Sequence, residues 1–481
     1  MKMGSTFGSL ETGVRALRAQ QLALQVTGQN IANADTPGYS RQIPVVRSTA
    51  PYSYPSTTRN AGAGQIGTGV EVTQIMRMRD QFIDAQIQNE TAAKGRWETR
   101  QSNLEHLEVV LNEPSDSSIS ARMKQFWKSL NELSTRSEDT SVRSSVIEDA
   151  IVFTETIRHT HQQLVDLKGD LDHEVSVIVG QVNTLAKQIA DLNEIITKVK
   201  GNEQEPNDLL DQRELLVQNL AELVNINVST DSFNRYNISV GGTLLVAGNS
   251  TATLAVDKNM DNEGLYDIVW EKNNVPASIT NGKLAGLLEM RDTEVNYYIN
   301  TLNTYAGTMI NQFNAVHREG FGLDNTYDVP FFTGTDASNI DVHQDIKVNT
   351  KLIAASAQVS PDPPPNGSGA PGNGENATRL ANVINQDLLM SNGTFTLTEY
   401  YNGMIAKLGI DAEKANTTAH NQETLINYLQ DRQESIAGVS MDEEIANMIK
   451  FQNAYNASAR YITTIDEMLE KLINGTGTVG R

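Results

Sequence analysis

At both ends of the chain, positions spaced alternately by three and four are mostly apolar, with exceptions at Gln21, Gly28, Gln452 and Asp466. The N-terminal seam runs through Phe7, Leu10, Val14, Leu17, Leu24 and Ile31. The C-terminal seam runs through Met441, Ile445, Met448, Tyr455, Ala459, Ile462, Leu469 and Ile473. A strict three-four repeat is the narrow stripe of a coiled coil, whereas a globular helix carries a broader apolar face. The pattern predicts a long helix at each end, and we expect the two helices to pair.

A turn stops the first of these helices. The segment from Asn33 to Tyr39 contains Thr36, Pro37 and Gly38 in succession. Pro37 lacks a backbone N–H and disfavours helical geometry at the residue before it, and glycine readily takes the positive φ that a type II turn requires at its third position. The sequence from 40 to about 64 is expected to be extended or irregular, and alternation over 69–75 predicts a short strand.

Helical spacing dominates the next part of the chain. It predicts four helices, over about 77–112, 119–133, 141–200 and 207–224. The third contains a strict three-four repeat, which we assign to an internal bundle within one folded chain. Helical spacing returns near Leu284 and again over about 400–439.

Two stretches break the helical pattern. Between Ile226 and Glu271, short runs rich in Val, Ile, Leu and Thr alternate with Gly, Asn and Asp, which indicates a small β insertion. The part from Phe321 to Leu397 is the least regular and includes a proline-rich loop over 361–369.

The expected fold is therefore mainly α, a discontinuous helical coiled coil and bundle built from both termini, with an inserted small β domain and an irregular α+β outer region. Residues 1–60 with 440–481 form the terminal coiled-coil domain. Residues 61–225 with 282–323 and 400–439 form a long-helix bundle, 226–281 the β insertion, and 324–399 the variable outer region.

Composition narrows the function. The 481 residues include 59 acidic and 38 basic side chains, for a net charge of −21, and no cysteine. This charge argues against nucleic acid and anionic membrane surfaces, and the lack of cysteine excludes disulfides and thiol chemistry. No apolar run is long enough to span a membrane, and the first residues lack the apolar core of a cleaved secretory signal.

The candidate chemical motifs are weak. Residues 62–67 fit G-x-G-x-x-G, but no strand–helix context surrounds them, so a glycine turn is expected. Residues 257–264 begin like a calcium loop but lack its glycine and its final glutamate, which favours a hairpin turn. The seven histidines show no metal-binding spacing, and we assign them to solvated helix faces. No cofactor, metal or enzymatic activity is expected, although a carboxylate pair among 59 acids stays open.

Both ends also resemble a known family. The segment from Ala16 to Gln42 contains Asn30, Asn33, Thr36, Pro37, Gly38 and Tyr39, a core that is similar to the one shared by flagellar rod and hook proteins. The following Ser40-Arg41-Gln42, the block 282–292 and the block 438–460 resemble the FlgK family of bacterial flagellar hook-associated proteins. The part from about 333 to 395 shows no such likeness.

The resemblance implies a structural protein of the extracellular flagellum. It implies a junction ring of identical copies between hook and filament, in contact with the hook protein and a second junction protein. It also implies export in an unfolded state by the flagellar type III apparatus, with an export chaperone on the C-terminal helix. Another axial protein, such as the second junction protein or a hook subunit, and an enzyme or adhesin that carries a bundle, are the alternatives.

The terminal helices raise one further expectation. Burying a single seam does not offset the conformational entropy lost when so long a helix is ordered. We therefore expect the termini to be weakly ordered in the free monomer and to become fully helical on assembly.

Overall fold

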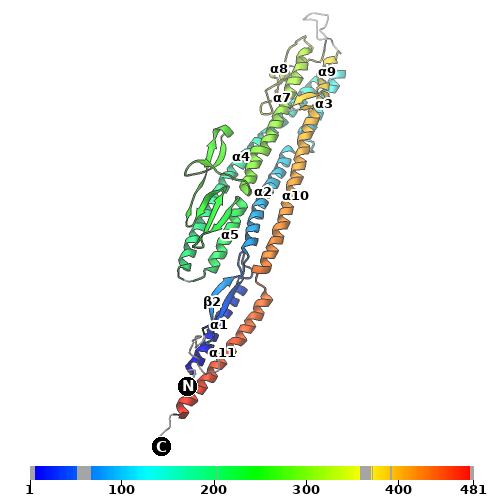
Figure 1. Ribbon diagram of the computed structural model, residues 1–481. Helices are drawn as coiled ribbons and strands as arrows, with labels where there is room; N and C mark the ends of the chain where they lie inside the picture. Colours follow the sequence, from blue (N-terminus) through cyan, green and yellow to red (C-terminus); the bar gives the residue numbers. More distant parts are fainter. Residues whose placement is uncertain are drawn as a thin grey trace.

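The chain is elongated, with both ends at one extremity (Figure 1). The structure, a computed structural model, describes residues 6–50, 67–202, 204–357, 370, 372–390 and 393–476. For residues 6, 7 and 476 only the backbone is described. A small terminal unit lies at one end, and a larger body of long helices makes up the remainder.

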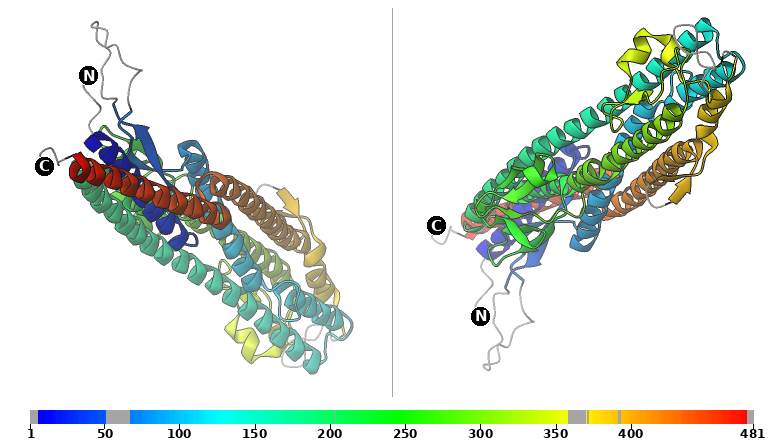
Figure 2. Two further views of the ribbon diagram at one scale, coloured as in Figure 1. Left: turned by 90° about the horizontal axis from the view of Figure 1, so that it is seen from below. Right: turned by 90° about the horizontal axis from the view of Figure 1, so that it is seen from above.

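Two antiparallel helices form the terminal unit. Helix α1 covers Thr6–Ala32 and α11 covers Met441–Thr476, and Figures 1 and 2 both show them side by side. Strands β1 (Gln42–Ser48) and β2 (Val70–Arg77) pair as a hairpin that also packs on α1. The expected pairing of the two terminal helices is confirmed. Strand β2, which lies within the predicted range 61–225, belongs spatially beside α1.

The body is a bundle of long helices around one apolar core. Its members are α2 (Gln81–Leu111), α3 (Ile119–Thr135), α4 (Thr140–Lys200), α5 (Asn207–Leu223), α6 (Lys283–Glu289), a π-helical turn (Met290–Val295), α7 (Asn296–Glu319) and α10 (Leu397–Ala437). Asp80, Ser118 and Asp139 cap the N-termini of α2, α3 and α4 through their side chains. Because most heptad positions of α4 are buried against the other helices, the internal-bundle prediction for that helix is confirmed.

Two small antiparallel sheets form the β insertion. One contains β3 (Asn227–Thr230), β4 (Tyr236–Val240), β5 (Thr243–Ala247) and β6 (Ser250–Thr251), and the other contains β7 (Leu254–Asn259), β8 (Leu265–Trp270) and β9 (Val275–Pro276). The calcium-like segment forms the turn between β7 and β8, where Glu263 and Gly264 have φ of 55° and 79°. The hairpin prediction for this segment is therefore confirmed.

The far end of the body carries only short elements. These are β10 (Phe332–Thr333), β11 (Asp341–Val342), α8 (Gln344–Val348), α9 (Glu375–Ala381), β12 (Leu388–Met390), β13 (Gly393–Phe395) and two 3-10 turns (Thr350–Leu352 and Asn382–Asn385). They close over a cluster of aromatic rings that includes Phe126, Phe313 and Phe331. The proline-rich segment 361–369 lies outside the described residues.

One prediction about side chains is wrong. His317 is fully buried and His161 nearly so, although we assigned all histidines to solvated helix faces. Both lie on core-facing positions of long helices, where an imidazole can be buried if its polar atoms find partners. Within the described ranges, none of the helices is both long and apolar enough to cross a bilayer. The four predicted domain boundaries remain predictions.

Candidate functional site: the terminal helices and their joint to the body

The turn after α1 has the geometry expected from its sequence. Gly38 has φ of 79°, and the Tyr39 amide donates to the Thr36 carbonyl at 3.1 Å. The Thr36 hydroxyl donates to the Asn33 side chain at 3.2 Å, which fixes the start of the turn. Positive φ at the third position together with this hydrogen bond is the pattern of a type II turn. The turn brings the chain back beside the C-terminal end of α1.

Asn30 is the buried centre of this turn. Its side-chain NH₂ donates to the Gln42 carbonyl at 2.9 Å and to the Glu444 carboxylate at 3.1 Å. Its side-chain oxygen accepts from the Gln42 amide at 3.0 Å and from the Tyr39 hydroxyl at 2.9 Å. Burial raises the pKa of the Tyr39 hydroxyl, and nearby carboxylates add to the shift. One amide thus ties α1 to both the returning chain and α11.

The three residues after the turn bind two different helices. Ser40 donates through its amide at 3.0 Å and its hydroxyl at 2.7 Å to Asp211 on α5. Gln42 donates to Asp208 at 2.9 Å, again on α5. Arg41 pairs instead with Glu443 and Glu444 at the start of α11, at 2.7 and 2.8 Å.

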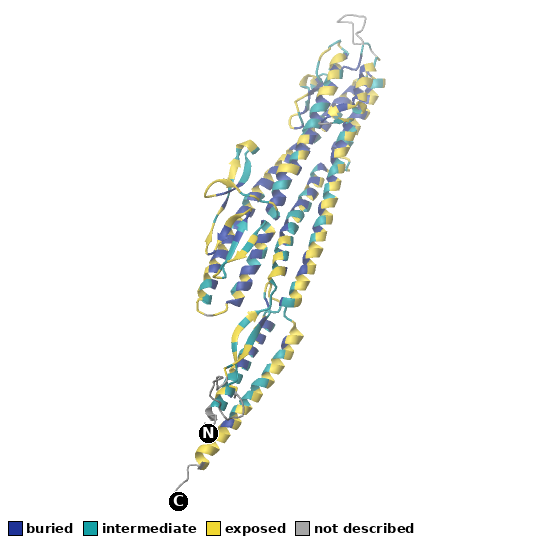
Figure 3. Ribbon diagram, in the orientation of Figure 1, coloured by how far each residue is buried: buried dark blue, intermediate teal, exposed yellow. Residues whose placement is uncertain are grey.

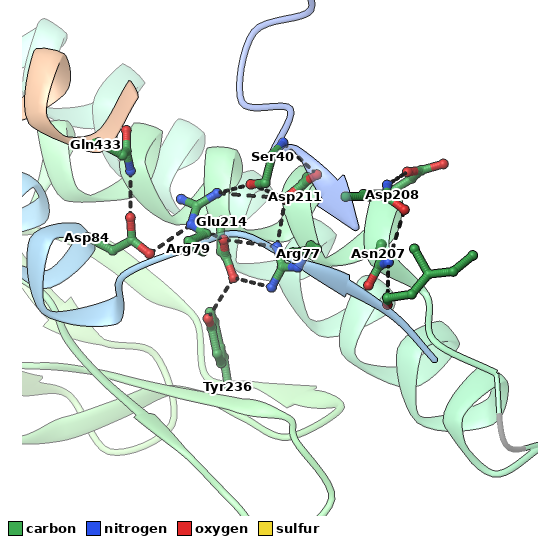
Figure 4. A network of polar contacts seen from close by, with 12 residues as sticks. Ser40, Arg77, Arg79, Asp84, Asn207, Asp208, Asp211, Glu214, Tyr236 and Gln433 are labelled. Carbon is green, nitrogen blue, oxygen red and sulfur yellow. Dashed lines mark hydrogen bonds and ion pairs between the residues drawn. The ribbon is translucent and has the colours of Figure 1, made fainter. Parts of the chain in front are cut away.

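Two arginines, one at the end of β2 and one just after it, complete the contact with α5 (Figure 4). Arg77 reaches Asp211 at 2.7 Å and Glu214 at 3.0 Å, while Arg79 reaches Glu214 and Asp84, each at 2.7 Å. Burial opposes the charge of both guanidinium groups, but Glu214 and the other carboxylates outweigh it and raise their pKa. Burial also raises the pKa of Asp211, because the attraction of Arg77 does not fully compensate for lost solvation.

Sequence reasoning missed this side of the site. The sequence identified Ser40-Arg41-Gln42 only as part of the resemblance to the FlgK family. It did not identify the acidic residues of α5 as their binding partners. A usable signal existed, because Asp208, Asp211 and Glu214 follow each other at intervals of three and so share one face of a helix.

The N-terminal seam lies mostly within the terminal unit. Leu10, Val14, Leu17, Leu24 and Ile31 are half-buried, and the buried apolar residues of α1 are Ala19, Ala23 and Val26 among its described side chains. Gly13 marks the closest approach to α11, since a Cβ there would lie 2.7 Å from Ile462. Phe7 belongs to the residues whose side chains are not described.

The C-terminal seam divides into two halves. Tyr455, Ala459 and Ile462 are half-buried and Leu469 is buried, whereas Ile473 is 65% exposed at the helix end. At the other end of α11 lies the proximal patch, in which every side chain is between 37% and 51% exposed: Met441, Ile445, Met448 and Ile449. Figure 3 shows the corresponding exposed outer face of α11.

Neither a metal-binding cluster nor a nucleotide-binding strand–helix element is found among the described residues of the site. Groups of three or more His, Asp or Glu side chains that could hold a metal ion do not occur among the residues the structure describes. Of the glycine-rich motif 62–67, only Gly67 is described, and the element that follows it is strand β2 rather than a helix. The site consists of exposed apolar surface on α11 and of a polar joint, the set of hydrogen bonds and ion pairs that connects the terminal unit to the body.

Comparison with known proteins supports this reading of the ends. Residues 10–39 match the flagella basal body rod protein family, residues 434–475 the C-terminal part of the basal body rod FlgEFG proteins, and residues 104–332 the helical domain of flagellar hook-associated protein FlgK. Flagellar hook-associated protein 1 of Bacillus subtilis is 34% identical over the full length of both chains. The chain belongs to the FlgK family of flagellar hook-associated proteins.

Other members of the FlgK family are more distant. Flagellar hook-associated protein 1 of Salmonella typhimurium is 26% identical over 95% of this chain, and that of Escherichia coli 25% over 97%, with nearly all of each relative covered. The solved structure of the flagellar hook junction protein FlgK from Burkholderia pseudomallei matches with a TM-score of 0.63, over 73% of this chain and all of that chain, at 17% identity. This last likeness concerns the fold alone.

FlgK-family membership establishes the broad role. The chain is a structural component of the bacterial flagellum and assembles with other axial proteins of that organelle. The relatives that carry this name are flagellar structural proteins.

Proposed function

We propose that this chain forms the junction ring between the flagellar hook and the filament, in which identical copies pack through their N- and C-terminal helices. The ring would contact the hook protein on one side and a second junction protein on the other. Family membership favours this role over that of a hook subunit or of the second junction protein itself, because full-length similarity is to hook-associated protein 1.

The observation that carries the proposal is the proximal patch. Four apolar side chains at the base of α11 remain exposed although they belong to, or adjoin, a strict heptad pattern. Contiguous exposed apolar surface of this kind marks an interaction site. A neighbouring copy that covered the patch would supply the burial that one α1–α11 pair lacks.

Export and delivery form the second part of the proposal. The chain would leave the cell unfolded through the flagellar type III apparatus, with a chaperone covering the C-terminal helix until export. The exposed apolar face of α11 is a surface that such a chaperone could cover, and the absence of cysteine avoids disulfide formation outside the cell.

Deletion of the gene followed by complementation tests the junction role. We expect the deletion strain to build hooks without filaments and to release flagellin monomer into the medium, and the native gene to restore filaments. A double variant of the patch, Ile445→Ser with Met448→Ser, should be secreted but should not restore filaments, because it removes the apolar surface that neighbouring copies bury.

The matched control is Met260→Ser, which changes an even more exposed methionine in the β insertion. It should complement as well as the native gene. Normally anchored filaments in the deletion strain would refute the junction role, and full complementation by the patch variant would refute the part assigned to the proximal patch.

A further inference from the structure

The joint between the terminal unit and the body has no apolar core of its own. Among the described residues, the two apolar clusters of buried side chains contain no member from α1, β1, β2 or α11. Apolar contact at the joint includes Leu215 of α5, from which a Cβ on Gly38 would lie 3.4 Å away, and Leu210 of α5, which is buried outside both clusters and lines a pocket with Ile75. The terminal unit is therefore attached to the body with little of the hydrophobic burial that usually fixes two parts of a chain.

No helix continues through the joint either. Helix α1 ends at Ala32, β2 ends at Arg77 before α2 begins at Gln81, and α10 ends at Ala437 before α11 begins at Met441. The two crossing segments, 78–80 and 438–440, are tied to the turn after α1 by the backbone of Arg41, which donates to Ala437 and accepts from Met78, both at 2.8 Å. Two non-helical crossings leave the angle of the terminal unit free to change unless side chains hold it.

Side chains on one face of α5 bind the terminal unit and hold it against the body. Asp211 accepts from both donors of Ser40 and from Arg77, and Glu214 accepts from Arg77 and from the hydroxyl of Tyr236 at 3.1 Å. Both carboxylates are largely buried, with side-chain exposures of 6% and 7%. Ion pairs with this little solvent are sensitive to the loss of one partner, because the remaining charge is left buried and unpaired.

We propose that Asp211 and Glu214, together with Ser40, Arg77 and Arg79, form a polar lock that sets the angle between the terminal helices and the body. The lock joins two parts with different relatives: the rod-protein match ends at residue 39, and α5 lies inside the FlgK helical match. Ser40 is the first residue beyond the shared rod segment. In the proposed ring, a role that rests on the proposed function, the lock fixes how each body projects from the inner helices.

The distance across the joint tests the lock. The chain has no cysteine, so Gln430→Cys on α10 and Ala446→Cys on α11 give two unique sites for spin labels, both exposed. Each site lies within about two turns of the joint, so fraying at the helix tips does not enter the measurement. With the lock intact, pulsed electron resonance on the purified full chain should give one narrow distance distribution.

The double variant Asp211→Asn with Glu214→Gln should at least double the width of that distribution. Ser40→Ala, which removes one donor and no charge, should broaden it less and keeps the test valid if the double variant does not fold. Glu289→Gln is the control, because it removes a carboxylate bound to Arg96 at 2.8 Å within the body, and it should leave the width unchanged.

An unchanged width in the double variant, or in Ser40→Ala if only that variant folds, would overturn the lock. This outcome is separate from failure of the junction role, which is judged from filaments on complemented cells. The distance measurement uses the free chain and does not depend on ring formation.

Discussion

His317 shows how a buried side chain depends on a single protonation state. Its Nδ1 donates to the Val329 carbonyl at 2.7 Å, and its Nε2 accepts from the Ala354 amide at 3.0 Å. Only the neutral ring with hydrogen on Nδ1 can make both bonds. Burial, aided by the positive charge of Arg143, lowers the pKa of His317 to about 4. Below pH 6.5 the unfolded chain binds a proton that the folded chain refuses, so stability falls as the pH drops from 6.5 toward 4.

We expect His317 to contribute a loss of about 2 kcal/mol in the free energy of unfolding between pH 7 and pH 5. Urea unfolding at the two pH values, compared with His317→Gln, isolates this contribution because glutamine does not titrate. His420→Gln, at an exposed position, should leave the pH dependence unchanged. Equal pH dependence in the native chain and His317→Gln would contradict the assignment.

Asn30 and Asn33 illustrate that equal residue types in one motif can differ in importance. Replacing Asn30 by alanine removes the partner of the Gln42 backbone and one hydrogen bond each from the side chains of Tyr39 and Glu444. We expect the local opening free energy at the joint to fall by about 2 kcal/mol, which corresponds to roughly thirty-fold faster exchange of the Arg41 amide. Asn33→Ala, whose side chain bonds only within the turn, should change that rate less than threefold.

At the scale of the element, helical geometry explains why the C-terminal seam divides. A seven-residue repeat drifts by about 20° per heptad on a straight α-helix, because 3.6 residues make a turn. From Met441 to Ile462 the seam therefore rotates by about 60°. The distal half turns toward α1, where Ile462 meets Gly13, and the proximal half turns away. The drift leaves the proximal patch open to a neighbouring molecule.

Helical periodicity also places three polar residues of α4 on the face that contacts the β insertion. Asp172, Asn183 and Asn193 lie ten or eleven residues apart, about three turns, and so share one face. Asp172 accepts from the Tyr266 amide at 2.9 Å. Asn183 pairs with the amide and carbonyl of Leu254 at 2.9 and 2.7 Å, and Asn193 does the same for Tyr236 at 3.0 and 2.9 Å. These side chains fasten the β insertion to the helix as a neighbouring strand would.

We expect Asn183→Ala to loosen the second sheet of the insertion. Both backbone groups of Leu254 lose their partner, so amide exchange at Val269, which is paired with the adjacent Ala255, should become about tenfold faster. Thr184→Ala is the control, because that hydroxyl bonds only to Gly180 on its own helix. An exchange rate at Val269 that is the same in both variants would mean that Asn183 does not fasten the sheet.

For the whole molecule, stability should be unevenly distributed. The body has one large buried core, whereas the buried apolar side chains of α11 are Ile465 and Leu469 among its described residues. In the free monomer we expect amides of α1 and α11 to exchange at least a hundredfold faster than core amides of α4, with the fastest exchange at the tips farthest from the joint. Assembly should slow exchange in both helices. Protection in the free chain equal to that of α4 would show that the terminal unit is stable alone.

Much of the architecture could be predicted because it follows from local patterns. The heptads at both ends, the long α4, the β insertion and the turn at Gly38 each depend on spacing or on a residue with restricted geometry, and such signals lie within a few residues of one another. The two buried histidines could not be predicted, since the partners of His317 lie 12 and 37 positions away in sequence. The contacts between the terminal unit and the body could not be predicted for the same reason, because Ser40 and Asp211 are 171 positions apart.

The sequence by itself determined which segments are helical, that the two ends share a coiled-coil pattern, and which family the chain resembles. Only the tertiary structure decided which half of the C-terminal seam faces α1 and which half stays exposed, because that depends on the contact between two helices and on the drift of the seam around one of them. It alone also revealed that the terminal unit is attached through hydrogen bonds and ion pairs. Periodicity reports burial along one element, whereas a joint is made by side chains that meet only after the chain has folded.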